Sequence, residues 1–154
     1  MAGNSDGCGT DWTTFVKSMV DQYSINTRRV AAPELVKAAA IELGFKTLDI
    51  FGLYSVTNGL SLDPVEVFPI EDPKDVRNTW RGVRRVNDPS TTSNLGGDQD
   101  LLKRFFVFAH IGGGCCAAID REDGSLWYEE AGEFHQTTLS TAEFIDACLK
   151  EASE

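Results

Sequence analysis

The sequence of 154 residues lacks any apolar run that approaches the roughly 20 residues of a membrane-spanning helix. Residues 1–10 contain neither a basic cluster nor an apolar stretch, so no secretory signal is apparent. Internal repeats, a collagen-like period and sustained heptads are absent as well. These absences exclude the transmembrane, collagen-like and coiled-coil classes. They predict a soluble, cytoplasmic protein with no membrane partner.

Cysteine and histidine are scarce, and their spacing is uninformative for metals. The four cysteines and two histidines are Cys8, Cys115, Cys116, Cys148, His110 and His135. No C-x-x-C pair occurs, and the adjacent pair Cys115 and Cys116 is poorly placed to form a disulfide or to chelate one ion. We therefore expect reduced thiols, no metal and no cofactor.

Basic residues are outnumbered, with 14 Lys and Arg against 24 Asp and Glu, a formal net charge of −10. The local sums are −5 over residues 1–73, +3 over residues 74–104 and −8 over residues 105–154. An acidic surface repels phosphate backbones, which argues against nucleic acid as a partner. It attracts basic proteins.

A hydrophobic content of 42% and 10% aromatic residues are those of a globular chain, and the length suits one domain. We expect residues 1–9 to be disordered and residues 10–154 to form a single α+β domain. Helical spacing and capping residues predict helices over 11–23, 33–44 and 47–58, with the first buried through Trp12, Phe15, Val16, Met19, Val20 and Tyr23. A capping box at Ser140 and Glu143 predicts a closing helix.

The middle and the end of the chain are expected to differ in structure. Residues 60–70 alternate as an edge or broken strand, and Asp72-Pro73 restarts a helix whose inner stripe is Val76, Trp80 and Val83. Residues 87–100 are read as a long loop. A mostly antiparallel meander of three strands follows at 105–111, 115–119 and 125–130.

Candidate catalytic groups are few. Gly112-Gly113-Gly114 lacks the lysine of a phosphate-binding loop and is better explained as a tight β connection. A thiol-dependent enzyme using Cys115 or Cys116 with His110 or His135 is a minor alternative, because its net negative surroundings would raise a thiol pKa. We expect no catalytic residues.

The candidate partner-binding site lies in the acidic last third of the chain. Six acids fall between positions 120 and 133, against the single base Arg121. An aromatic residue, Trp127 or Tyr128, could provide the apolar anchor that charges lack, although strand alternation leaves open which one faces outwards. The predicted site comprises Asp120, Glu122, Asp123, Tyr128, Glu129, Glu130 and Glu133. The alternative is that these acids only keep a hairpin edge soluble.

Four segments in order resemble the SUKH superfamily of yeast cell-wall synthesis regulators and bacterial immunity proteins. They are F-G-L-Y-S-V-T-N-G (51–59), F-A-H-I-G-G-G-C-C-A-A-I-D (108–120), D-G-S-L-W-Y (123–128) and T-L-S-T-A-E-F-I-D-A-C-L (138–149). The resemblance covers most of residues 10–151, and the stretch from Asp72 to Asp100 departs from it. It implies an α+β fold without a conserved catalytic constellation.

The resemblance also implies a function. A non-enzymatic protein-binding module is expected, namely an immunity protein that neutralises a polymorphic or contact-dependent toxin by occlusion. Its partner would be a basic toxin domain, with which an acidic protein associates quickly. The alternative is a regulatory scaffold, as in the eukaryotic or viral branch of the family.

Overall fold

Apolar and aromatic strands joined by tight turns build one meandering sheet. The computed structural model describes residues 9–92 and 94–154. In these residues seven antiparallel strands are hydrogen-bonded in the order of the chain. They are β1 (Asn26–Thr27), β2 (Leu60–Leu62), β3 (Val65–Val67), β4 (Phe105–Gly112), β5 (Cys115–Asp120), β6 (Leu126–Glu130) and β7 (Glu133–Thr137). The predicted disorder of residues 1–9 falls, apart from Gly9, outside the described residues.

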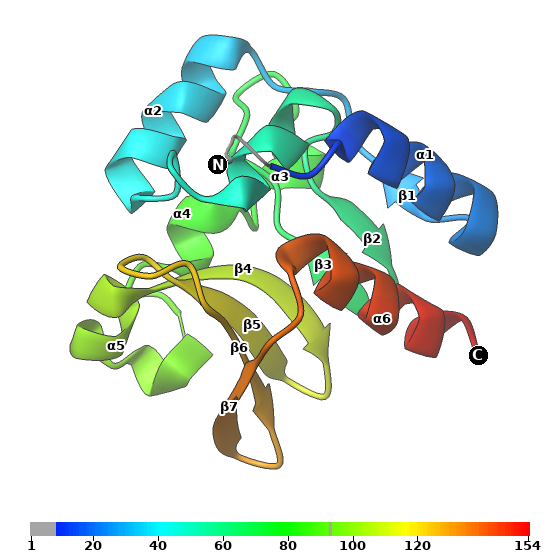
Figure 1. Ribbon diagram of the computed structural model, residues 1–154. Helices are drawn as coiled ribbons and strands as arrows, with labels where there is room; N and C mark the ends of the chain where they lie inside the picture. Colours follow the sequence, from blue (N-terminus) through cyan, green and yellow to red (C-terminus); the bar gives the residue numbers. More distant parts are fainter. Residues whose placement is uncertain (1–8, 93) are drawn as a thin grey trace.

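Helices lie on both faces of this sheet (Figure 1). They are α1 (Trp12–Tyr23), α2 (Pro33–Leu43), α3 (Val76–Thr79), α4 (Val83–Val86), α5 (Gln99–Arg104), α6 (Thr141–Ser153) and the 3₁₀ turns η1 (Asp49–Ser55) and η2 (Asn94–Gly97). The α+β class, the C-terminal meander and the closing helix predicted from the sequence are confirmed.

Successive aromatic residues of β4 divide the core between the two faces. Phe106 stacks on Phe45 at 4.4 Å between ring centroids, on the face covered by α2, η1, α1 and α6. Phe105 turns the other way and meets Trp127 and Phe134 at 5.7 and 5.0 Å. Neighbouring strand residues point to opposite faces, so β4 contributes apolar side chains to the packing on both faces of the sheet.

Several predicted helix boundaries are confirmed by local capping. The Asp11 side chain accepts a hydrogen bond from the Thr14 N–H at the start of α1. Gly44, with φ of 76°, ends α2 in the left-handed region that glycine adopts without strain. The capping box of Ser140 and Glu143 starts α6 as expected.

The predicted helix after Asp72 is wrong in its inner stripe. The segment forms two short helices, α3 and α4, and only Val83 of the three stripe residues is buried, whereas Val76 is 62% and Trp80 is 57% exposed. The Glu71 carboxylate accepts hydrogen bonds from the backbone N–H groups of Arg84 and Arg85. These bonds satisfy donors at the start of a new helix and thereby separate α4 from α3.

Three further differences concern the strands of the sheet and the segment before β4. Residues 60–70 contain a hairpin of two strands instead of one, and the meander has an additional strand, β7, after the turn at Ala131-Gly132. The predicted loop 87–100 contains η2 and the start of α5, which contact β5 and β4 and cover the second face of the sheet. The buried Asn87 amide, moreover, pairs with the N–H and C=O of Val107 at 2.8 and 2.9 Å.

Candidate functional site

A hollow opens where two hairpins of the sheet separate. Pairing of β5 with β6 stops at Ala117 and Tyr128, whereas β4 and β5 continue to their own turn, and β6 and β7 continue to theirs. The two hairpin tips therefore point apart beneath α6 (Figure 1). The space between the tips and α6 measures about 650 Å³. We call it the hairpin groove.

Apolar groups form most of the walls of the hairpin groove. Helix α6 contributes Phe144, Ala147 and Cys148, and the segment before it contributes Leu139, which is 40% exposed. The ring of Tyr128 lies 5.8 Å from that of Phe144 and lines the groove from β6. Exposed apolar surface in a concave site with an aromatic anchor is typical of binding sites.

The charged residues that line the groove are all acidic. They are Glu129, Glu130 and Glu151, and no Lys or Arg of residues 9–92 and 94–154 lines the groove. Glu129 also has a structural role. Its Oε1 accepts a hydrogen bond from the Cys116 N–H at 2.8 Å and so links β5 to β6 beyond their last backbone pair. Glu130 and Glu151 are exposed and available to a cationic group.

The structure brings only part of the sequence-predicted site together. Tyr128, Glu129 and Glu130 line the hairpin groove, and Glu133 lies on the same β6–β7 tip, paired across it with Glu130. Glu122 and Asp123 lie at the turn that precedes β6, at its opposite end. A strand rises about 3.4 Å per residue, so the five residues of β6 separate these acids from the groove by more than ~10 Å.

Asp120 is not a surface acid, which corrects its place in the predicted site. Its residue is 0% exposed, and its Oδ2 lies 2.8 Å from Nε and Nη2 of Arg104. Its Oδ1 accepts the Glu122 N–H at 2.8 Å. The carboxylate therefore closes the β5–β6 turn onto the start of β4 and is out of a partner's reach.

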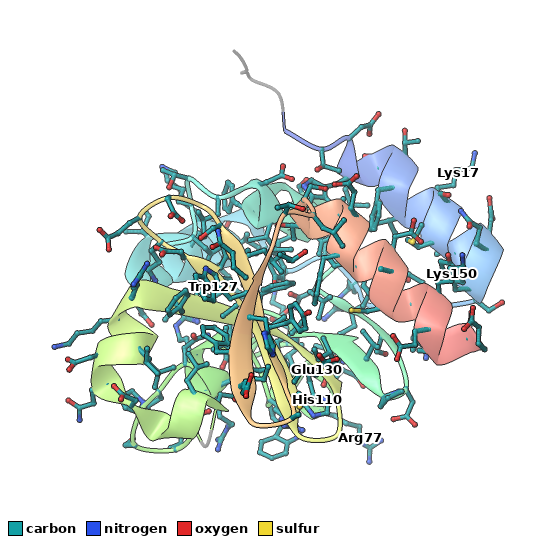
Figure 2. The ribbon with its side chains drawn as sticks, turned by 60° about the horizontal axis from the view of Figure 1, so that its bottom comes forward. Lys17, Arg77, His110, Trp127, Glu130 and Lys150 are labelled. Atoms are coloured by element: carbon teal, nitrogen blue, oxygen red, sulfur yellow. The ribbon has the colours of Figure 1, made fainter. Side chains whose placement is uncertain are left out.

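The open choice between Trp127 and Tyr128 is settled by the face each occupies. Trp127 stacks on Phe134 at 5.3 Å, and its Nε1 donates to the Ser125 hydroxyl at 3.0 Å. Tyr128 turns to the α6 face and contacts Phe144 and His135. Figure 2 shows that Trp127 lies farther from the tip of the β6–β7 hairpin than Glu130 does. Tyr128 is therefore the aromatic residue of the groove.

The contribution of α6 was missed in the sequence-based prediction. Phe144, Cys148 and Glu151 line the groove at positions i, i+4 and i+7, which share one face of a helix. This spacing is visible in the sequence. The sequence does not show which strands this helix face contacts. The β6–β7 turn lies more than ten residues before Phe144, and the separation of the two hairpin tips is a property of the folded sheet.

The thiols show little sign of activation. Burial, first of all, and the neighbouring Glu129 raise the pKa of Cys116 far above its ordinary value. Burial raises the pKa of Cys148 to about 11. Cys115 is half-buried and lines the hairpin groove, and its thiol is 3.8 Å from the Gly113 carbonyl oxygen. Two of these three groups are therefore protonated at neutral pH, unlike a nucleophilic thiolate.

Other chemistry-bearing motifs form turns. Gly112, Gly113 and Gly114 all have positive φ and join β4 to β5, which confirms the predicted β connection. Within residues 9–92 and 94–154, no group of three or more His, Cys, Asp or Glu side chains is placed to hold a metal ion. In the same ranges, no helix has both the length and the apolar character required to cross a membrane.

Comparison with known proteins adds no assignment: no protein-family model matches the chain, and no curated protein matches it significantly.

Proposed function

We propose that this protein is a non-enzymatic binding module that holds a basic segment of a protein partner in the hairpin groove. We further propose that it acts as an immunity protein, which neutralises a toxin by covering the toxin's functional surface. The observation that carries the proposal is a concave apolar site whose charged lining residues, Glu129, Glu130 and Glu151, are all acidic.

Apolar contacts and electrostatic attraction both favour a basic partner in the hairpin groove. Tyr128 and Phe144 offer apolar surface to a side chain of the partner, and desolvated aromatic anchors supply most of the binding energy of small interfaces. The three glutamates attract Lys and Arg at the rim and speed association. The net charge of −10 adds long-range attraction to a basic toxin. The SUKH resemblance favours the same function, and it stays a prediction.

The proposal predicts that a toxin is encoded beside the gene for this protein, and the experiment uses that toxin. The purified toxin domain is titrated with the protein, association rates are measured at several salt concentrations, and survival is scored on co-expression. Glu130→Lys is expected to lower the association rate roughly fivefold to tenfold at low salt and to flatten its salt dependence. Tyr128→Ala is expected to speed dissociation instead.

Glu122→Lys provides the matched control. It makes the same charge reversal on an exposed acid of the same sequence cluster, at the far end of β6. If Glu122→Lys and Glu130→Lys slow association equally, the partner responds to overall charge and the groove is not its site. If the protein neither binds nor protects against the toxin, the immunity function is refuted. Stable binding to a regulatory protein in its place would favour the scaffold alternative.

A further inference from the structure

A second hollow lies at the edge of the sheet, beside β1 and the segment that leads into α3. It measures about 580 Å³, and every residue that lines it is polar or charged. In the part of the chain that the structure describes, its charged residues are Arg28, Arg29 and Lys74 against the single acid Asp75. Three cations around one hollow are unusual in a chain with a net charge of −10. We call this hollow the cationic pocket.

Arg28 is held in place while part of its guanidinium stays unused. Its Nε donates to the Asn78 carbonyl oxygen at 3.1 Å, and its Nη2 forms an ion pair with Glu66 at 2.6 Å. Its Nη1 is buried and has no hydrogen-bond partner among the described residues. A buried donor without an acceptor costs about 1–3 kcal/mol, so this position favours an incoming acceptor.

The other donors around the pocket are partly used, because Arg29 Nη2 donates to the Lys74 carbonyl oxygen at 3.2 Å. Lys74, Thr27 and Ser61 also line the pocket, and within residues 9–92 and 94–154 the Lys74 ammonium and the two hydroxyls form no hydrogen bond or ion pair with another residue. The one acid is partly occupied, because Asp75 Oδ1 accepts a hydrogen bond from the Asn78 amide at 2.8 Å. The pocket therefore presents cations and hydroxyl donors to one space.

We propose that the cationic pocket binds an oxyanion, a phosphate or carboxylate group, of a small polyanionic ligand. A guanidinium that is already fixed on two sides loses little side-chain entropy when an anion binds beside it, and an ammonium and a second guanidinium add charge. The hydroxyls of Thr27 and Ser61 can turn to donate to the remaining oxygens. A basic partner of the hairpin groove is repelled from this pocket, so the two sites select ligands of opposite charge.

Calorimetric titration of the full chain with pyrophosphate and with citrate tests the proposal, at constant ionic strength set with sodium chloride. Saturable binding of one ion per chain is expected, and the stronger of the two ions identifies phosphate or carboxylate as the recognised group. Arg29→Gln and Lys74→Gln are each expected to weaken binding about tenfold, or ~1.4 kcal/mol. Ser61→Ala, which changes no charge, is expected to weaken it about threefold.

Lys103→Gln is the matched control, because it removes one exposed positive charge from α5, which lies well away from β1 (Figure 1). The affinity of this variant for pyrophosphate or citrate should stay within about twofold of that of the unchanged protein. Thermal melting of each variant verifies that the fold is retained. The proposal is overturned if neither ion binds saturably, or if Lys103→Gln weakens binding as much as Lys74→Gln does.

Discussion

Replacing Arg121 by Met tests whether the one basic residue of the acidic segment 120–133 stabilises the fold. In the sequence Arg121 is a lone positive charge among acids. In the structure its Nε donates to the Leu43 carbonyl oxygen at 2.6 Å. Its Nη1 lies 2.6, 3.0 and 2.9 Å from the carbonyl oxygens of Leu102, Lys103 and Phe105. One guanidinium thus joins the ends of α2 and α5 to the start of β4.

The expected cost follows from these contacts. Hydrogen bonds to a charged group contribute about 1.5–3 kcal/mol each, but they are not additive, because three of the carbonyls share one nitrogen. The last carbonyls of α2 and α5 also lose a favourable charge at their negative ends. Burial lowers the pKa of Arg121, and this desolvation offsets part of the gain. We expect Arg121→Met to lower the free energy of unfolding by ~3 kcal/mol.

Urea denaturation followed by circular dichroism and tryptophan fluorescence measures this loss. A change of ~3 kcal/mol corresponds to a Tm lower by about 6–12 °C for a chain of this size. Arg84→Met is the control, because Arg84 makes an exposed ion pair with Glu42 at 2.9 Å, and such pairs contribute at most about 1 kcal/mol. A loss no larger than that of Arg84→Met would refute the structural role of Arg121.

Three further outcomes are expected. Asp120→Asn should lower the free energy of unfolding by about 1–3 kcal/mol in urea, because it weakens a buried acceptor of Arg104, and should leave the association of a groove partner unchanged. Iodoacetamide at pH 8 should leave Cys116 and Cys148 unmodified in peptide maps until denaturant is added, since burial raises both pKa values; rapid labelling of Cys116 would support the thiol enzyme instead. The Ser140 N–H and hydroxyl lower the pKa of Glu143, so the folded value lies below the unfolded value of about 4.3, and the stabilisation exists above that pH and is lost as pH falls. The Tm difference between Glu143→Ala and the unchanged protein should therefore shrink between pH 6 and pH 3; a difference constant with pH would contradict this origin.

Features whose partners lie within one helical turn could be predicted from the sequence. Asp11 caps α1 through Thr14, three residues on, and Ser140 and Glu143 cap each other at the same spacing. Gly44 ends α2 because its own backbone can adopt positive φ. The apolar run of β4 is long enough to indicate a strand by itself. For the three helix ends the stabilising contact is local, so the residue types alone carry the information.

The candidate site depended on contacts that cross the chain. The acids of residues 120–133 form one group in the sequence, but the extended strand β6 lies between Glu122 and Glu130 and keeps them apart. Asp120 is withdrawn from the surface by Arg104, sixteen positions earlier. The spacing of Trp80 predicted a buried position on one helix. In the structure, the Glu71 carboxylate binds the N–H groups at the start of a separate helix beyond Trp80, and Trp80 is exposed.

The amino-acid sequence was sufficient to predict the α+β class, the bounds of α1 and α2, the start of α6, the glycine connection between β4 and β5, and the acidic character of the last third. These properties depend on composition, on periodicity and on hydrogen bonds between near neighbours. The tertiary structure alone decided that the hairpin tips separate beneath α6 and that Tyr128 meets Phe144 there. It also gathered Arg28, Arg29 and Lys74 around one hollow. Such groupings arise when the apolar faces of distant segments are buried together. The free energy gained by this burial depends on the whole packed chain rather than on any one segment.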